Sequence, residues 1–157
     1  APEHVSDTVL RTMRKPGIEQ YRRFVNAFND SVKIHGKKYC IVEYFMSAHP
    51  GCTLNDAVEL AVYLHRNRIE PEQVQDFYPA PMTLAGAMFY TGVDPVTGES
   101  VYVPRTDREK ALQRALLLHH KPEFQAKARE ALVEAGRKDL IGRGGNCIVP
   151  PGNDSRK

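Results

Sequence analysis

The sequence "FMSAHPGCTLND", residues 45–56, contains a histidine, a proline, a glycine and a cysteine in four consecutive positions. His49 and Cys52 have a spacing that zinc ligands use, and His119 with His120 could complete a four-ligand site if the fold brought them together. A nucleophilic pair is a second possibility, but side chains that flank a proline-glycine turn seldom point at each other. The third possibility is a plain turn, which uses the same residue types.

The segments on either side of this stretch predict a strand before it and a helix after it. Residues 38–46, "KYCIVEYFM", are almost continuously apolar and rich in β-branched and aromatic side chains, which is typical of a parallel strand buried on both faces. Thr53 and Asp56 form a helix-capping signature, and apolar residues follow at helical spacing as far as Leu64. We therefore expect a turn at the carboxyl end of a strand, where parallel α/β structures bind ligands.

The rest of the chain alternates between helices and strands without internal repeats. Further predicted elements are a helix from Ile18 to Val32 that stops at Gly36, a strand in "QVQDFYP" (73–79), and a helix from Thr106 to about His120. Pro122 separates the latter from another helix, which runs from Phe124 to Ala135 and ends at Gly136. Residues 80–104 predict a loop with a short helix and a hairpin. Because the order begins αβαβ, "DFYPAP" after the second strand is another candidate ligand loop.

Composition limits the classes of protein that this chain can represent. Its 157 residues suit one domain, and its net charge of +3 is spread without a basic stripe, so no dedicated nucleic-acid surface is indicated. Three cysteines, Cys40, Cys52 and Cys147, form no even disulfide framework, which favours a reducing compartment and predicts a cytoplasmic location. No signal segment or membrane span is evident, and we expect a soluble protein.

Six stretches of the chain, taken together and in order, resemble the C-terminal part of the YgiQ-type radical SAM proteins. They are "APEHVSDTVLRTMRKP", "YFMSAHPGCTLNDAVELAVYL", "QVQDFYPAPMTLAGAMFYTGVDP", "VYVP", "KALQRALLLHHKPEFQ" and "EALVEAGRKDLIGRGGNCIVP". The resemblance covers nearly the whole chain. Radical SAM enzymes reduce S-adenosylmethionine with a [4Fe-4S] cluster and form a 5′-deoxyadenosyl radical inside a partial (β/α) barrel.

The resemblance implies an α/β fold in which residues 1–80 are the last two or three βα units of a partial (β/α) barrel. "APEH" would end the fourth strand, and the two predicted strands would be the fifth and sixth. Residues 81–149 would form a mostly helical C-terminal extension without an established activity, and residues 150–157 a disordered tail. The class binds its cluster with a CxxxCxxC loop, which this sequence lacks. We therefore expect a fragment of an iron–sulfur oxidoreductase of unknown substrate, inactive and without cofactors on its own.

The resemblance also implies positions that bind the cofactor, although it assigns no catalytic residue and no metal ligand. These positions are Glu3, His4, Ser47, His49, Pro50, Gly51 and Gln75. The first two would contact the ribose or methionine part of S-adenosylmethionine, or else belong to a frayed terminus. The turn at 47–51 would shape the adenine side, with His49 alternatively a capping or core-edge histidine. Gln75, Asp76 and Tyr78 would face the barrel mouth, or else belong to an ordinarily packed strand.

Partners and an alternative function follow from the same residues. The expected partners are the remainder of the parent barrel and its unknown substrate, and open strand edges predict self-association of the isolated chain. The alternative function is a stand-alone interaction or RNA-binding module that uses the hairpin at 93–107 and the helix at 108–121. Its positive charge is too sparse for strong phosphate binding. Cys147 would either cap an additional cluster or anchor the C-terminal segment.

Overall fold

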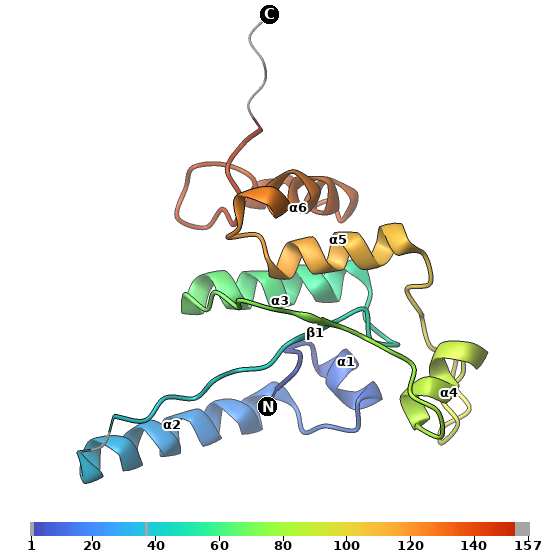
Figure 1. Cartoon of the computed structure of the whole chain (residues 1–157), viewed down its shortest axis with the longest axis horizontal. Helices are drawn as coiled ribbons and strands as arrows, with labels where there is room; N and C mark the ends of the chain where they lie inside the picture. Colours follow the sequence, from blue (N-terminus) through green and yellow to red (C-terminus); the bar gives the residue numbers. More distant parts are fainter. Residues whose placement is uncertain (1, 37, 153–157) are drawn as a thin grey trace, which may run out of the picture.

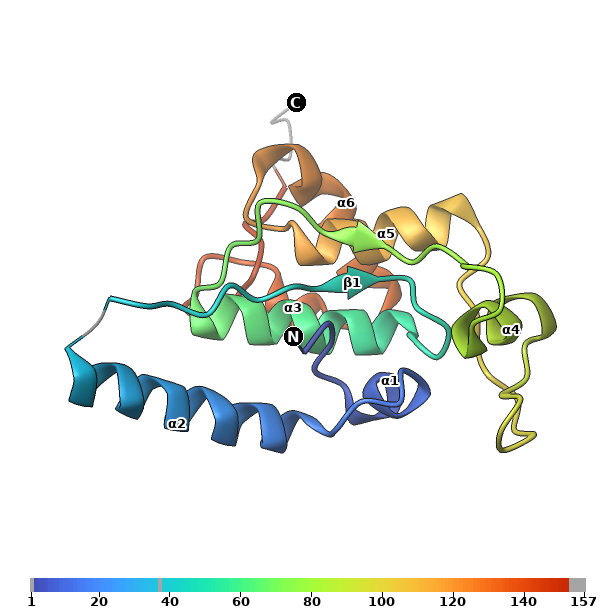
Figure 2. The same cartoon turned by 60° about the horizontal axis from the view of Figure 1, so that its bottom comes forward.

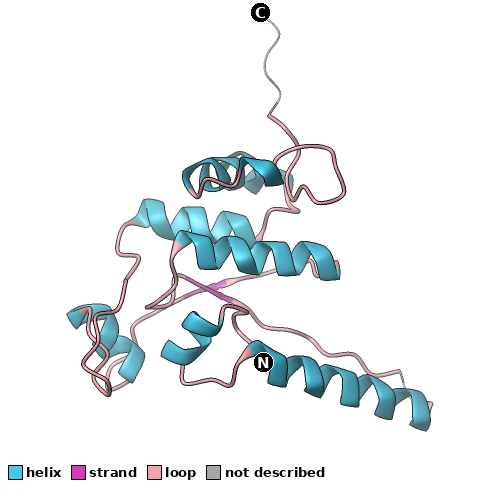
Figure 3. Cartoon of the chain, turned by 180° about the vertical axis from the view of Figure 1, so that it is seen from behind, coloured by secondary structure: helices cyan, strands magenta, loops and turns pink. Residues whose placement is uncertain are grey.

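Helices dominate residues 2–36 and 38–152, the part of the chain that this computed structural model describes (Figure 3). The elements are α1 (Asp7–Thr12), α2 (Ile18–His35), β1 (Met46–Ser47), α3 (Leu54–Asn67), β2 (Gln75–Asp76), α4 (Leu84–Thr91), α5 (Asp107–Leu117), α6 (Pro122–Glu134) and the 3-10 helix η1 (Lys138–Leu140). The fold is therefore mixed α/β and mostly helical.

Three chain segments run parallel and side by side at the centre of the fold. Strands β1 and β2 pair in parallel, with Met46 opposite Gln75. Glu3 forms a further parallel bridge with Phe45, in which the N–H of Glu3 donates to Tyr44 at 3.0 Å and its carbonyl accepts from Met46 at 2.9 Å. The predicted parallel pairing is confirmed, and it brings the carboxyl ends of the three segments to one edge.

The main core lies between the strands and three helices that follow in successive layers. Figure 1 shows α3, α5 and α6 stacked outward from the strands, and α5 packs against both of its neighbours. Leu60 and Leu64 of α3, Leu112 and Leu116 of α5, and Leu132 of α6 are fully buried. In contrast, α2 projects away from this stack, and the chain that returns from it follows the edge of the molecule (Figures 1 and 2).

Local sequence signals explain where most helices begin and end. Thr53 and Thr106 each form a capping box, with Asp56 and Glu109 respectively, as predicted. Gly36 ends α2 in the left-handed conformation, with φ of 60°. The short helix α4 and an antiparallel bridge between Val93 and Ser100 confirm the elements expected in residues 80–104. Helix α1 was not predicted, because six residues give too little helical periodicity.

The predicted strand at 38–46, buried on both faces, is wrong. Only Met46 belongs to a strand, while Tyr39 and Val42 of the preceding segment are 65% and 86% exposed. Near β1 the burial alternates: Phe45 and Ser47 are buried, whereas Tyr44 is exposed and Met46 is half-buried. Alternation arises when only one face of a strand is covered, and here α5 packs against β1.

The predicted disordered tail at 150–157 lies largely outside the described residues, because the structure describes it only as far as Gly152. Pro150 is anchored, since its carbonyl accepts a hydrogen bond from Arg129 at 3.2 Å. Cys147 is partly buried, and its Sγ lies 3.7 Å from the carbonyl oxygen of Asp139. The N–H of Ile148 also donates to the carbonyl of Leu140 at 2.9 Å, so the C-terminal loop packs against η1.

Candidate functional site

A cavity of about 430 Å³ opens at the carboxyl ends of the three parallel segments. Each segment contributes one predicted site residue to its lining: Glu3, His49 and Gln75. The loop that follows α1 adds Arg14 and Lys15. Thr12, Met13 and Met46 also line it, and another wall comes from residues between 77 and 85, where β2 leads into α4. The structure therefore brings together three of the seven positions that the sequence predicted for cofactor binding.

Two of the predicted residues lie outside the cavity lining because they support the loops around it. His4 is buried, where its Nδ1 accepts a hydrogen bond from the N–H of Ser6 at 3.1 Å. The hydroxyl of Ser47 donates to Asp76, whose other oxygen accepts from Arg114 at 2.8 Å. Asp76 therefore belongs to a polar contact between β2 and α5 and does not face the cavity, whereas Tyr78 lines it.

Pro50 and Gly51 form a turn that residues far along the chain hold in place. The carbonyl of Pro50 accepts from the Thr12 hydroxyl at 2.9 Å, and the N–H of Gly51 donates to the carbonyl of Tyr102 at 2.7 Å. Gly51 has φ of 90°, and a Cβ atom there would lie 2.8 Å from the side chain of Thr12. Only glycine fits this turn without displacing α1.

Gln113 of α5 joins the two ends of the same turn, although no sequence pattern marked it as a site residue. Its Oε1 accepts from the N–H of Ala48 at 3.0 Å, and its Nε2 donates to the carbonyl of Cys52 at 2.8 Å. Gln113 is 1% exposed, so both backbone groups lack water as an alternative partner. Ala48 has φ of 60°, a left-handed conformation that alanine rarely adopts.

His49 presents one ring nitrogen that has no hydrogen-bond partner among the described residues. Its Nδ1 lies 2.7 Å from the carbonyl oxygen of Pro50, which can only accept, so Nδ1 carries the proton. Burial lowers the pKa of His49, which favours the neutral ring. In that tautomer Nε2 is a hydrogen-bond acceptor. The edge-on contact with Phe77, 5.0 Å between ring centroids, fixes the ring orientation.

The charged groups around the cavity form ion pairs. Lys15 lies 2.8 Å from the carboxylate of Glu3. Both carboxylate oxygens of Asp94 lie 2.6 Å from Arg14, which connects the hairpin after α4 to the loop after α1. The pKa of Asp94 is lowered, first by the N–H of Val96 and also by Arg14. The cavity therefore combines paired charges with a neutral histidine and an amide.

The structure does not support the zinc and nucleophile interpretations of His49 and Cys52. The Sγ of Cys52 lies 3.5 Å from Nε2 of His4, and burial raises the pKa of this thiol, which disfavours the nucleophilic thiolate. His119 instead contacts His65 and His120, with ring centroids 5.9 and 6.1 Å apart. Within the part of the chain that the structure describes, no group of three His, Cys, Asp or Glu side chains could hold a metal ion.

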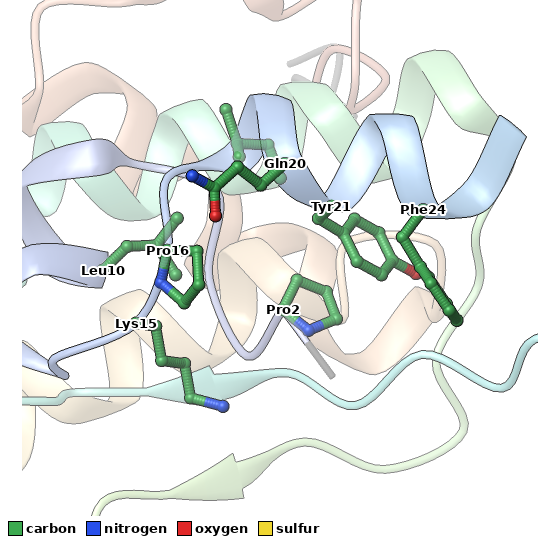
Figure 4. Close-up of a pocket in the computed structure, with 8 residues that line it drawn as sticks. Pro2, Leu10, Lys15, Pro16, Gln20, Tyr21 and Phe24 are labelled. Atoms are coloured by element: carbon green, nitrogen blue, oxygen red, sulfur yellow. The ribbon is translucent and has the colours of Figure 1, made fainter. Parts of the chain in front are cut away.

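A second cavity, of about 420 Å³, lies beside α2 and has a mostly apolar lining. Figure 4 shows Pro2, Leu10, Tyr21 and Phe24 around it. Further exposed large apolar side chains occur on α2 and on the chain that returns from it. They are Phe24, Ile34, Tyr39, Val42 and Tyr44, and we call these residues the α2 face. Exposed apolar side chains in this number are typical of a site that another chain segment covers.

Comparisons with known proteins place this chain among larger relatives. A UPF0313 protein of Clostridium perfringens is 51% identical over 157 residues, which is 100% of this chain and 24% of the relative. UPF0313 proteins of Methanocella arvoryzae (50% over 151 residues, 96% of this chain and 25% of the relative) and Methanosarcina mazei (47% over 157 residues, 100% and 25%) are similar. The chain thus spans about a quarter of the length of these curated relatives.

The comparison with family models identifies the region that begins just before β2 and continues to the end of the chain. No solved structure matches the chain. Across the described residues, none of the helices combines the length and the apolar character needed to cross a membrane. One family model matches residues 72–157, more than half of the chain, and its description is "domain of unknown function (DUF3362)". The chain therefore belongs to the DUF3362 family.

Proposed function

We propose that this chain is the C-terminal part of a radical SAM iron–sulfur oxidoreductase, in which it forms one wall of the cavity for S-adenosylmethionine and substrate. The observation that carries the proposal is the convergence of Glu3, His49 and Gln75, from three parallel segments, on one cavity. Ligand sites of parallel α/β structures lie at this end of the strands. The parallel segments would be the last strands of a partial barrel whose earlier strands precede this chain.

The cavity residues suit the binding of S-adenosylmethionine, whereas the cysteines do not suit the binding of an iron–sulfur cluster. Glu3 offers carboxylate oxygens and Gln75 an amide, so hydroxyl and amino groups of the cofactor would find partners. Reductive cleavage is the chemistry that the cofactor would supply when bound. The cysteines do not fit a cluster, because Cys52 is buried next to His4 while Cys40 is exposed. The cluster ligands would therefore lie elsewhere in the parent protein.

The remainder of the parent barrel would cover the α2 face. Pro2, which precedes Glu3, lines the apolar cavity beside α2, and the described residues place no strand on the side of Glu3 that faces away from Phe45. The relatives are about four times as long as this chain, so they have enough additional chain to supply those strands. A cytoplasmic parent protein agrees with the three free cysteines, because thiols stay reduced in that compartment.

The alternative of an RNA-binding or interaction module finds less support in helix α5. Leu112, Ala115 and Leu116 of this helix are buried in the core. Both of its arginines are engaged as well, since Arg108 pairs with Glu130 and Glu134 of α6, and Arg114 with Asp76. Little of the helix remains available for phosphate groups.

Anaerobic reconstitution of the parent protein with iron and sulfide tests the proposal. We expect a [4Fe-4S] signal in electron paramagnetic resonance, and formation of 5′-deoxyadenosine from S-adenosylmethionine under reduction. In the same protein Glu3→Gln and Gln75→Leu should raise the KM for S-adenosylmethionine. Gln73→Leu is the matched control, because Gln73 is exposed and outside the cavity lining. A reconstituted parent without a cluster or without cofactor cleavage contradicts the proposal.

A further inference from the structure

The DUF3362 region supplies the apolar wall of the cavity at the strand ends. Phe77, Tyr78, Leu84 and Ala85 line one side of it, and all four lie within the matched residues 72–157. Their position is fixed locally: the Thr83 hydroxyl donates to the carbonyl of Ala80 at 2.8 Å and accepts from the N–H of Gly86 at 3.0 Å. These bonds start α4 directly beside the cavity.

The region is also connected to the opposite side of the cavity by hydrogen bonds and an ion pair. Asp94 binds Arg14 of the loop after α1, the carbonyl of Tyr102 accepts from Gly51, and Gln113 bonds Ala48 and Cys52. These contacts reach the very turn that carries His49. The wall and the turn are therefore one packed unit, and a ligand in the cavity contacts both.

The polar side of the cavity indicates what kind of group faces this wall. His49 is only 5% exposed, and its Nε2, an acceptor in the neutral ring, has no partner among the described residues. His49 lines the cavity, so a ligand hydroxyl or amino group that donates to Nε2 can take the place of water there. Glu3 and Lys15 neutralise each other, as do Arg14 and Asp94, so a net charge on this part of the ligand finds no matching charge.

We propose that the DUF3362 wall binds the apolar part of a small neutral molecule, a ring or a branched alkyl group, whose hydroxyl or amino group donates to Nε2 of His49. The volume of about 430 Å³ is in the range of small-molecule sites. The ring or alkyl group packs against Phe77 and Leu84. This inference rests on the proposed function in one respect, because it names the substrate class for the same cavity.

Nuclear magnetic resonance of the 157-residue chain tests the inference with two probes of similar shape. The first probe is p-cresol, which has an apolar ring and a hydroxyl donor; 4-methylanisole has the same ring without the donor. We expect p-cresol to shift the methyl signals of Met46 and Leu84 saturably and to move the ¹⁵N signal of His49 Nε2. It should bind about fivefold more tightly than 4-methylanisole, as expected for one neutral hydrogen bond.

Two variants assign the effect to the two sides of the cavity. Leu84→Ala should weaken p-cresol binding severalfold, whereas Tyr90→Ala should leave it unchanged; both residues are exposed on α4, but only Leu84 lines the cavity. His49→Phe should remove the preference for p-cresol. If this variant does not fold, the ¹⁵N shift of His49 in the unmodified chain still decides whether Nε2 accepts the hydrogen bond.

Several outcomes overturn the inference without touching the proposed function. They are the absence of saturable shifts at the cavity methyl groups, equal affinity for the two probes, and preferential binding of inorganic phosphate there. These measurements involve neither cluster nor S-adenosylmethionine. Conversely, a parent protein that fails to cleave S-adenosylmethionine overturns the proposed function, while the preference for p-cresol in this chain remains an independent result.

Discussion

Gln113 and Ala48 are 65 residues apart in the sequence, yet the side-chain oxygen of Gln113 accepts the backbone N–H of Ala48 at 3.0 Å inside the core. The same amide donates to the carbonyl of Cys52. One side chain from α5 thus closes the loop that carries His49 to the cavity. The helical region beyond residue 72 consequently determines the shape of a turn that precedes it in the sequence.

Replacement of Gln113 by leucine removes both hydrogen bonds from this loop. Two buried backbone groups then lose their partners, so the free energy of unfolding should fall by about 2–4 kcal/mol. Urea denaturation followed by circular dichroism measures this change. Gln73→Leu is the control, because an exposed glutamine with no core partner should change stability by less than about 0.5 kcal/mol. Equal effects of the two substitutions would show that the Gln113 bonds do not hold the loop.

Signals within a few residues of each other were sufficient to predict much of this fold. The capping boxes at Thr53 and Thr106 and the end of the helix at Gly36 were predicted correctly, because each depends on neighbours within four residues. The burial of Gln113 was not predicted, because it is a polar residue outside the apolar positions of this helix. Its partners could not be predicted, because they depend on how α5 packs against the strands.

The prediction for residues 38–46 was wrong because burial of a strand depends on its neighbours. The apolar sequence "KYCIVEYFM" indicated two covered faces, but in this chain Tyr39 and Val42 face outward. For the candidate site, three of the seven predicted positions line the cavity, and their role in binding a cofactor stays a prediction. Arg14, Lys15 and Asp94 were missed, because nothing in their local sequence distinguishes an ion pair at a cavity from ordinary surface charge.

Substitution of Gly51 by alanine tests the close approach of the turn to α1. The added Cβ would lie 2.8 Å from Thr12, and φ of 90° disfavours any side chain, so we expect a loss of about 1–3 kcal/mol in unfolding free energy. Thermal and urea unfolding measure it. Gly145→Ala is the matched control, because a Cβ atom added at Gly145 would meet no other group within 4 Å. If Gly51→Ala leaves the free energy of unfolding unchanged, the turn adopts another conformation in solution.

The buried His4 makes stability depend on pH. Burial, with a smaller contribution from His49, lowers the pKa of His4 to about 4, while Asp56 opposes the shift. The unfolded chain binds a proton on His4 below about pH 6.5, whereas the folded chain binds it only near pH 4. The free energy of unfolding is therefore at its full value above pH 6.5 and falls as the pH drops towards 4. The loss attributable to this group is about 3 kcal/mol across that window.

His4→Asn separates this titration from the remaining histidines. Asparagine keeps an acceptor for the N–H of Ser6 but cannot bind a proton, so the decline in unfolding free energy between about pH 6.5 and 4.5 should be shallower than in the unmodified chain. His49, His119 and His120 also have lowered pKa values, so part of the slope should remain. Urea unfolding at several pH values provides the comparison, and identical slopes would contradict the assignment to His4.

The exposed α2 face should make the isolated chain self-associate, because Ile34 and Val42 are 80% and 86% exposed and lie on a surface that the parent protein would cover. We expect sedimentation velocity to show a concentration-dependent increase in mass, and Val42→Lys with Ile34→Glu to restore the monomer. Val96→Lys is the control, because Val96 is also 65% exposed but lies in the hairpin after α4. Addition of the preceding segment of the parent protein in trans should compete with self-association, since both would occupy the same surface. A chain that stays monomeric at all concentrations, or that responds equally to Val96→Lys, would show that the α2 face does not drive association.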